Sequence, residues 1–590
     1  MNLFSKIMWL ALLTGVLSAC THKPQETTIT LYCTTDVHGS IFNFDLKENK
    51  PTNNSLSNLS QFLKEVRQDG KKDYILLDGG DFLQGQPSNY YSNFIDTGTM
   101  NLASKVMNFL EYDVASVGNH DIEAGHKVYD KVKGEFQFPW LAANILDLRT
   151  GQPYFKPYTV IFRQGIKIVV FGMITPGIPK WLPRHLWSGM EFMDMLETAK
   201  HWVPKIQEEE KPDLLVGLFH SGFDYTYGGE NEHTPNNENA SLLVAQKVEG
   251  FDVVILGHDH QGKVELITND VGQQVQIIDS RSHADCVGKV TIHLKKKEGK
   301  YRKKYEAELI ELGKLEQDSE YNLRFQPELE KVKNYIDTKI GTFTQAVSGR
   351  EGMFGPSAFT DLIHDAQLAC TGADISFSTI LQRDALINEG TITIRDMFNL
   401  YKYENGLYTM TFTGEEIHRY LEYAYGLQYN TMRSSKDHLL NFQTDEKGEL
   451  VRGNHGNYLL INDFFNFSCA AGIRYTVDIS KTPGNRVKIH SMSDGTRFYA
   501  DSTYLVAINS YRGNGGGGHL TRGVGLTKEE MLGRVVSIKE KDVRYYISEY
   551  IKTHKTLTPK CRNDWKVVPA NWFKAGKEQD YRLLYYTSKI

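Results

Sequence analysis

Short apolar runs recur along the first half of the chain and alternate with stretches that have helical spacing. Five of these runs read as buried parallel strands, because such strands form near-continuous apolar stretches. They are residues 28–33, 74–77, 113–117, 214–219 and 253–256. Helical stretches such as 56–66 and 99–110 lie between them. The alternation predicts α/β layers from residue 28 to about residue 312.

A polar motif follows each of the five apolar runs. The carboxyl ends of strands in an open α/β sheet are where ligands bind, so the five motifs predict one shared site. Their Asp, Asn and His side chains, without Cys, are the ligands of a hydrolytic site for two divalent metal ions. In chain order they are Asp36-Val37-His38, Gly80-Asp81, Gly118-Asn119-His120-Asp121, His220-Ser221-Gly222 and Gly257-His258-Asp259-His260.

The residue types suggest which side chains bind each of the two ions. Asp36 and His38 stand two positions apart at a strand end, so one turn aims both at one ion. Asp81 is the natural bridging carboxylate, Asn119 offers an amide oxygen, and His220 serves the second ion. His258 and His260 flank Asp259 and can each reach a different ion. Any one of these motifs alone is more often a structural turn than a ligand. The occurrence of all five in one chain instead favours a metal site.

The second half has a different organisation. A charged stretch over residues 316–340 has near-helical spacing and is expected to connect two domains, with the boundary within 312–345. Beyond it, a helical stretch (358–370) and strands (407–412 and 505–509) indicate an α+β domain over residues 346–590. Thr413 is placed to cap a further helix. A chain of 590 residues exceeds one ordinary core, which supports two domains.

The first residues predict export. Lys6, the apolar residues 7–17 and the sequence Leu17-Ser18-Ala19-Cys20 have the order of a signal peptide, here residues 1–19. The segment 17–20 resembles the lipobox of bacterial lipoproteins, which implies cleavage before Cys20 and a lipid anchor on it, followed by a tether over residues 20–27. A plain secretory signal is the alternative. The expected location is the periplasm, the outer membrane or the cell surface.

Charge and cysteine content argue against a nucleic-acid-binding protein, a zinc-thiolate site and a disulfide framework. The net charge of −5 gives no basic surface for a nucleic-acid polymer. The cysteines other than Cys20 are scattered and odd in number, without a C-x-x-C pair, so neither a zinc-thiolate site nor a disulfide framework is indicated. The polar stretch 225–239 follows a ligand motif and is expected to be either a wall or lid of the site or a solvated surface loop.

Taken together, the five motifs resemble the calcineurin-like metallophosphoesterase superfamily over roughly residues 28–300. The resemblance implies a four-layer α/β/β/α sandwich. It implies that Asp36, His38 and His260 bind one metal, that Asn119, His220 and His258 bind the other, and that Asp81 bridges them. His120 would act on the phosphoryl group or the leaving oxygen, as a cationic imidazole. Its orienting carboxylate would be Glu123, three residues on, or Asp121.

The second half carries nucleotide-recognition features. Asn509-Ser510-Tyr511-Arg512-Gly513-Asn514 leads into a glycine run, which lets backbone approach a ligand, and Tyr511 offers a flat face for a base. Asp463-Phe464-Phe465-Asn466-Phe467 adds aromatic side chains. The two-part layout resembles the secreted bacterial 5′-nucleotidase family. The segments 395–405 and 413–416 and the Tyr511-Arg512-x-Asn514-Gly-Gly pattern are similar to its 2′,3′-cyclic-nucleotide 2′-phosphodiesterase/3′-nucleotidase branch.

That resemblance implies that two aromatic rings enclose the base, here Phe467 and Tyr511, with Phe465 as the alternative to Phe467. The Asn-Gly-Gly-Gly-x-Arg segment of 5′-nucleotidases is missing after Ala373-Asp374-Ile375, and Arg383 is its possible remnant. The chain is therefore expected to be a nucleotide phosphohydrolase with two divalent ions, whether Mn, Zn, Fe or Co. The alternatives are a hydrolase of a UDP-sugar or sulfur ester on the same scaffold, and a non-catalytic surface lipoprotein.

Overall fold

A computed structural model of the protein describes residues 23–67, 71–453 and 456–586. Two six-stranded sheets form the centre of the first domain. The first sheet has the order β16-β15-β1-β4-β5-β6, and the second has the order β13-β14-β12-β11-β9-β8. The strands of the first sheet are β1 (Glu26–Thr34), β4 (Tyr74–Asp78), β5 (Val114–Ser116), β6 (Trp140–Leu141), β15 (Cys286–Lys297) and β16 (Lys300–Glu311). Those of the second are β8 (Tyr158–Arg163), β9 (Ile166–Ile174), β11 (Leu214–His220), β12 (Val253–Leu256), β13 (Lys263–Thr268) and β14 (Gln274–Asp279).

The five predicted strands are all present, and they divide between the two sheets. β1, β4 and β5 run parallel in the first sheet, whereas β11 and β12 run parallel in the second. A core of aliphatic side chains from both sheets, including Ile29, Leu77, Val216 and Ile255, fills the space between them. The carboxyl ends of the five strands therefore meet at one end of a sandwich rather than at one edge of a single sheet.

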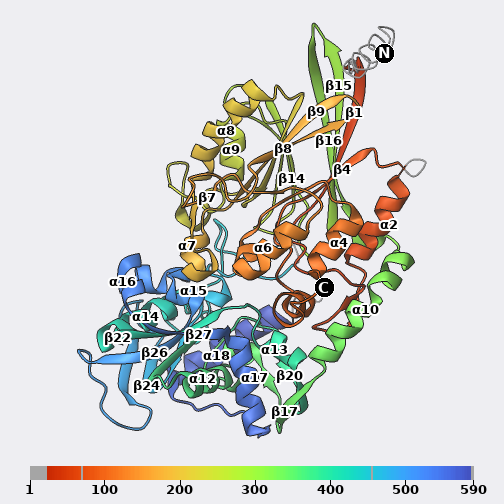
Figure 1. Ribbon diagram of the computed structural model, residues 1–590. Helices are drawn as coiled ribbons and strands as arrows, with labels where there is room; N and C mark the ends of the chain where they lie inside the picture. Colours follow the sequence, from red (N-terminus) through yellow and green to blue (C-terminus); the bar gives the residue numbers. More distant parts are fainter. Residues whose placement is uncertain (1–22, 68–70, 454–455, 587–590) are drawn as a thin grey trace, which may run out of the picture.

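Helices cover both outer faces, which completes the four-layer α/β/β/α architecture expected for this half (Figure 1). Over the first sheet, helices α2 and α4 place their apolar faces in one hydrophobic core. Over the second sheet, α8 and α9 build a separate core with Phe171 and Phe219. The helices are α2 (Leu56–Val66), α4 (Leu102–Leu110), α8 (Met195–Glu209) and α9 (Ser241–Lys247).

The helix expected to connect the domains exists as α10 (Ser319–Ile336) and begins at the cap residue Asp318. It is packed on the first domain, where Tyr321, Phe325 and Leu329 are buried in the same core as α2 and α4. In Figure 1 it runs along one side of the first domain toward the second. The apolar stripe at helical spacing explains this packing, because a helix with such a stripe must bury it.

The second domain surrounds a five-stranded sheet of order β23-β19-β26-β22-β27. Helices α12, α14 and α17 share its hydrophobic core. Thr413 caps α14 as expected, through a reciprocal pair of hydrogen bonds with Glu416. The strands are β19 (Ile375–Ser378), β22 (Gly406–Thr413), β23 (Cys469–Ala471), β26 (Thr503–Asn509) and β27 (Val535–Asp542). The helices are α12 (Ala358–Thr371), α14 (Gly414–Gln428) and α17 (Val543–His554).

A short helix of the second domain, α13 (Ile394–Leu400), is inserted against the first. Phe398 is buried in the core of the first domain, with its ring edge-on to Tyr90 at 5.7 Å between centroids. Arg395 donates to the Leu46 carbonyl and to Asp337. Apolar burial and a nearly buried guanidinium thus join the two domains at one contact.

The predicted signal peptide, Cys20 and the first part of the predicted tether lie outside the described residues. Among the residues that the structure describes, there is no helix of the length and apolar character that crossing a membrane requires.

Candidate active site

The turns at the strand ends have an unusual backbone. Several of the expected ligands have positive φ angles, which side chains other than glycine adopt only when the surrounding structure holds them there. They are Asp36 (49°), His38 (47°), Asp81 (61°), His258 (83°) and His260 (60°). Close approach also requires glycine at position 118, because a Cβ there would lie 2.1 Å from Asp81 Oδ1. Backbone strain concentrated in this way is typical of functional sites.

The first expected metal group is assembled. Asp36 Oδ1 lies 3.2 Å from His260 Nε2 and 3.9 Å from His38 Nε2, and the two imidazole nitrogens are 3.2 Å apart. His38 is held by its other nitrogen, Nδ1, which contacts the Gln84 carbonyl at 3.1 Å. That contact leaves Nε2 free to face the site, as a metal-ligating histidine requires.

The second group lies directly beside the first. His220 Nε2 is 3.2 Å from Asp81 Oδ2 and 3.0 Å from Asn119 Oδ1, and His258 Nδ1 is 2.8 Å from the same amide oxygen. His220 Nδ1 contacts the Gly79 carbonyl at 2.8 Å. Asp81 Oδ2 also lies 3.9 Å from His38 Nε2, so this carboxylate stands between the two groups, where a bridging ligand belongs.

The chemistry of these donors fits metal ions. Asp36 Oδ1 is buried and has no hydrogen-bond partner among the described residues. Burial would raise the pKa of Asp36, but the nearby charges of His260 and His220 lower it below the ordinary value. A carboxylate oxygen without a donor, beside imidazole nitrogens that face one another, is an arrangement that a divalent cation satisfies. Candidate metal groups form around Asp36 with His38 and His260, and around Asp36 with Asp81 and His220.

His120 is oriented by Glu123. Its Nδ1 lies 2.5 Å from Glu123 Oε2, and its backbone nitrogen donates to Asp81 Oδ1 at 2.8 Å. Burial lowers the pKa of His120, but the charges of Asp81 and Glu123 outweigh this effect and raise the pKa to about 9. An imidazole in this environment is protonated at neutral pH and can donate a proton from Nε2.

Asp121, the other carboxylate considered from the sequence, has a structural role instead. Its two oxygens accept hydrogen bonds from the backbone nitrogens of Gly118, Asp81, Phe82 and Leu83. With both oxygens occupied by backbone donors, Asp121 joins the turns after β4 and β5. Of the two carboxylates that the sequence left open as partners of His120, Glu123 contacts the imidazole, whereas the carboxylate of Asp121 faces backbone donors.

The polar segment 225–239 forms a wall of the site through Glu238. Glu238 Oε1 lies 3.2 Å from His258 Nε2, the nitrogen that points away from Asn119. On its other side the His258 ring stacks on Trp181, with 5.7 Å between ring centroids. A carboxylate on the second nitrogen fixes the tautomer of a ligating histidine. Of the two sequence alternatives for this segment, the wall is the one observed.

The second domain contributes residues directly above His120. The ring of Tyr403 lies parallel to the imidazole, with an interplanar angle of 2° and 6.3 Å between centroids. Glu404 lines a pocket together with His120, Glu123 and Tyr90. Residues of both domains thus surround the imidazole that is expected to act on the substrate.

The residues predicted to bind the base differ in exposure: two are partly exposed and Phe467 is buried. Tyr511 and Phe465 are both partly exposed. Their segments lie side by side, because Arg512, which follows Tyr511, donates to the Phe465 carbonyl at 2.6 Å. The buried Arg512 also donates to Asn466 Oδ1 and to the Gly516 carbonyl, both at 3.0 Å. It therefore holds the glycine run against the aromatic segment. Asn514 Nδ2 contacts the Tyr408 hydroxyl at 3.4 Å.

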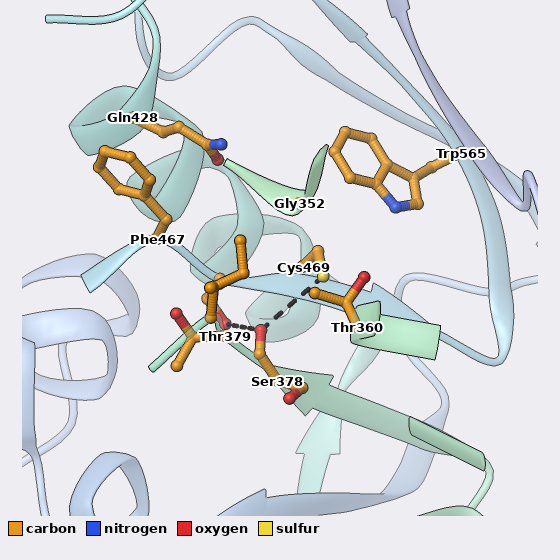
Figure 2. Close-up of a pocket in the computed structure, with 10 residues that line it drawn as sticks. Gly352, Thr360, Ser378, Thr379, Gln428, Phe467, Cys469 and Trp565 are labelled. Carbon is orange, nitrogen blue, oxygen red and sulfur yellow. Dashed lines mark hydrogen bonds between the residues drawn. The ribbon is translucent and has the colours of Figure 1, made fainter. Parts of the chain in front are cut away.

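Phe467 does not face the site in this structure. Its side chain is 4 % exposed and lines a small pocket of the second domain with Gln428 and Trp565 (Figure 2). A ring enclosed by core residues has no free face for a base, so Phe465, the alternative, is the partner available to Tyr511. Arg383 pairs with its neighbour Asp384 and lies over Phe464 at 5.7 Å.

Several residues of the site were not selected from the sequence. His283 donates its backbone N–H to the Asp36 carbonyl at 2.8 Å, and its ring lies 5.3 Å from that of His38, between centroids. Glu238, Tyr403 and Glu404 face the site from loops. Their only sequence signal is position: Glu238 lies near the end of the polar segment 225–239, and Tyr403 and Glu404 lie in the segment that resembles the cyclic-nucleotide branch.

Comparison with known proteins agrees with this architecture. Residues 29–262 match the calcineurin-like phosphoesterase family, and residues 339–522 match the 5′-nucleotidase C-terminal domain. A relative from Yersinia enterocolitica, a 2′,3′-cyclic-nucleotide 2′-phosphodiesterase/3′-nucleotidase, is 24 % identical and is matched over 96 % of this chain and 93 % of its own. A Haemophilus influenzae protein of the same description is 23 % identical over 91 % of this chain and 87 % of its own.

Solved structures show the same fold. A Staphylococcus aureus protein assigned as a 5′-nucleotidase, crystallised with α-ketoglutarate, superimposes with a TM-score of 0.74 at 20 % identity, over 92 % of this chain and 100 % of its own. A 5′-nucleotidase precursor from Thermus thermophilus has a TM-score of 0.61 at 20 % identity, with the same coverage.

Proposed function

The chain belongs to the calcineurin-like phosphoesterases that carry a 5′-nucleotidase C-terminal domain, and we propose that it hydrolyses nucleotides as a 2′,3′-cyclic-nucleotide 2′-phosphodiesterase/3′-nucleotidase. Its broader class is that of a metal-dependent phosphoester hydrolase. The observation that carries the proposal is the meeting of all seven expected ligand side chains at one end of the sandwich, where Tyr403 of the second domain stacks on the neighbouring His120.

In this proposal Asp36, His38 and His260 hold one divalent ion, and Asn119, His220 and His258 hold the other, with Asp81 between them. When bound, the two ions neutralise the phosphoryl oxygens and activate water. His120 donates its proton to the departing ribose oxygen, and Glu123 keeps the imidazole cationic and correctly turned.

The second domain supplies the nucleoside contacts. Tyr511 and Phe465 present rings to the base, and Arg512 fixes the loops that carry them. Asn514, at the start of the glycine run, is the side chain that we expect to contact a ribose or base edge. Because one domain holds the phosphate and the other holds the base, the relative position of the two decides which ribose oxygen reaches the metal centre.

A kinetic comparison of 5′-AMP, 3′-AMP and 2′,3′-cyclic AMP tests the proposal. We expect phosphate release from 3′-AMP and ring opening of the cyclic compound at higher kcat/KM than release from 5′-AMP. Uptake of two ions without turnover of any of the three would contradict the proposal. Reconstitution with Mn²⁺, Zn²⁺, Fe²⁺ and Co²⁺ in turn then identifies the preferred metal, since the donor set accepts each of them.

We also propose that the protein is an exported lipoprotein, supported by the signal-like residues 1–19 and the lipobox-like segment that ends at Cys20. Detergent phase partitioning in a bacterial expression host tests this. The full chain should enter the detergent phase, and Cys20→Ala should move it to the aqueous phase. Equal partitioning of both chains would contradict lipidation.

A further inference from the structure

A small pocket beside His120 is lined by residues of both domains. Gln84 and Tyr90 of the first domain and Glu404 of the second line it, together with His120 and Glu123. None of the seven expected metal ligands lines it. The pocket has room for a group of about the size of one water molecule. It therefore adjoins the imidazole that is expected to protonate the departing oxygen.

Two residues of this pocket each have a polar atom without a hydrogen-bond partner. Gln84 Nε2 and Glu404 Oε2 are both buried, and neither has a partner among the residues that the structure describes. Gln84 as a whole is 6 % exposed. Buried polar groups are almost always hydrogen-bonded, so each of these atoms requires an explanation. Because both residues line the same pocket, a polar ligand group in that pocket accounts for both.

The turn that carries Gln84 is fixed by hydrogen bonds on both sides. The backbone nitrogen of Leu83 donates to Asp121 Oδ1 at 2.9 Å, and Asn93 Nδ2 donates to the Leu83 carbonyl at 2.7 Å. The Gln84 carbonyl contacts His38 Nδ1 at 3.1 Å. The backbone of Gln84 is thus held directly against a residue of the expected metal centre.

Glu404 is held in place through Arg544. Its other oxygen, Oε1, accepts from Arg544 Nη2 at 3.1 Å. The Arg544 guanidinium lies over the Tyr90 ring at 5.2 Å and over the Phe398 ring at 4.1 Å, and both rings pack in the core of the first domain. Glu404 therefore reaches the pocket through the same contact that joins the two domains.

The two unpartnered atoms have opposite hydrogen-bonding roles. Gln84 Nε2 is a donor and Glu404 Oε2 is an acceptor. A hydroxyl group both donates and accepts, so it satisfies both atoms. A phosphate oxygen only accepts and leaves Glu404 unpaired, and a methylene group satisfies neither. The chemistry of the pair and the size of the pocket therefore favour an alcohol hydroxyl.

We propose that Gln84 and Glu404 bind the free hydroxyl group next to the departing ribose oxygen, which is the 2′-hydroxyl of a 3′-nucleotide. This inference rests on the proposed nucleotide hydrolysis. His120 protonates the departing 3′-oxygen, and the 2′-hydroxyl stands on the adjacent carbon, so it falls in the adjoining pocket. A 2′-deoxynucleotide leaves both buried atoms unpaired, which is the condition under which enzymes discriminate strongly. 5′-AMP has no hydroxyl on the carbon next to its departing group, so the subsite also favours 3′-AMP over 5′-AMP.

A ratio of two substrates separates this subsite from a general effect on catalysis. The measurement is kcat/KM for phosphate release from 3′-AMP, divided by that from 2′-deoxyadenosine 3′-monophosphate, with the metal-loaded full chain. We expect a ratio of at least about tenfold in wild type. Gln84→Met removes the donor, and Glu404→Gln replaces the charged acceptor with a neutral amide. Each should lower the ratio at least about threefold, and the double variant should bring it close to one.

The matched control is Glu416→Gln, since Glu416 is a buried carboxylate of the second domain that pairs with an arginine, Arg534, at 2.6 Å outside the pocket. It should leave the ratio at the wild-type value. A wild-type ratio below threefold would overturn the subsite. Equal losses on both substrates in Gln84→Met and Glu404→Gln would also overturn it, because they would assign the two residues to the support of His120. Absence of turnover of every nucleotide by wild type would contradict the proposed function, and the binding measurement below then decides on the subsite.

A binding measurement gives a second readout that needs no turnover. Calorimetric titration of the chelator-treated full chain compares adenosine with 2′-deoxyadenosine. We expect wild type and Glu416→Gln to bind adenosine at least about tenfold more tightly, and the double variant to bind the two nucleosides with dissociation constants within about twofold. Equal dissociation constants for the two nucleosides in wild type would overturn the proposal, as would a preference that the double variant retains. The melting temperature of each chain shows that the substitutions leave the fold intact.

Discussion

The pairing of His120 with Glu123 predicts a change in pH dependence when the carboxylate is removed. Glu123→Gln keeps the size of the side chain and replaces the charge that lies 2.5 Å from Nδ1. The pKa of His120 is about 9, against an ordinary value of 6.5, which corresponds to about 3 kcal/mol in favour of the imidazolium. Asp81 contributes to this effect, but metal ions bound to Asp81 would neutralise much of its charge. Glu123 is then the carboxylate that keeps the His120 imidazole protonated.

A carboxylate at this distance raises the pKa of an imidazole by about one to three pH units. As the acid in the reaction, His120 must be protonated, and activity falls as the pH rises through its pKa. The basic limb of kcat against pH should therefore move down by about one to two units in Glu123→Gln. At pH 8.5 kcat should fall about tenfold, whereas at pH 6 it should change less than threefold.

The assay is phosphate release from 3′-AMP between pH 5 and pH 10 with saturating metal. Asp130→Asn is the matched control, because Asp130 contacts His126 in a similar pair at 3.2 Å outside the site. Its profile should coincide with that of wild type. A basic limb in Glu123→Gln at the wild-type position would refute the assignment of His120 as the acid held by Glu123.

Three further predictions follow from other contacts. Tyr511→Ala should raise KM for nucleotides about tenfold, from the loss of about 1–3 kcal/mol of stacking, and spare a small aryl phosphate ester; equal losses on both would remove the stacking role. Phe398→Ala should lower the free energy of unfolding by about 3–5 kcal/mol in denaturant titrations, because this ring is buried between the domains; a loss below about 1 kcal/mol would show that it does not join them. Glu238→Gln should weaken metal affinity about tenfold or more in competition titrations, since it orients His258, and unchanged affinity would contradict that.

The arrangement of the metal ligands was predictable because parallel strands end together. Apolar runs followed by Asp, Asn and His were sufficient to bring Asp36, Asp81 and His220 together, although these residues belong to two sheets rather than one. The sequence gives no signal for that division, since a buried strand has the same pattern in either sheet. The cap at Thr413 was predictable for a similar reason, because it depends only on neighbours in the chain.

Contacts that depend on the side-chain direction were not predictable. Asp121 and Glu123 lie two residues apart in one turn, and only the fold shows that the first faces backbone donors and the second faces His120. Phe465 and Phe467 likewise differ by two positions, and the structure buries the second. The contact of Phe398 with Tyr90 arises from the docking of two domains, which leaves no pattern along the chain.

The proposed activity depends on seven side chains that together hold a pair of divalent ions. Metal analysis of the purified protein, for wild type and Asp81→Ala, tests it most directly, because Asp81 stands between both groups. We expect two ions per wild-type chain and at most one in the variant, with phosphate release abolished. Two ions retained by Asp81→Ala, or fewer than two bound by wild type in excess metal, would contradict it.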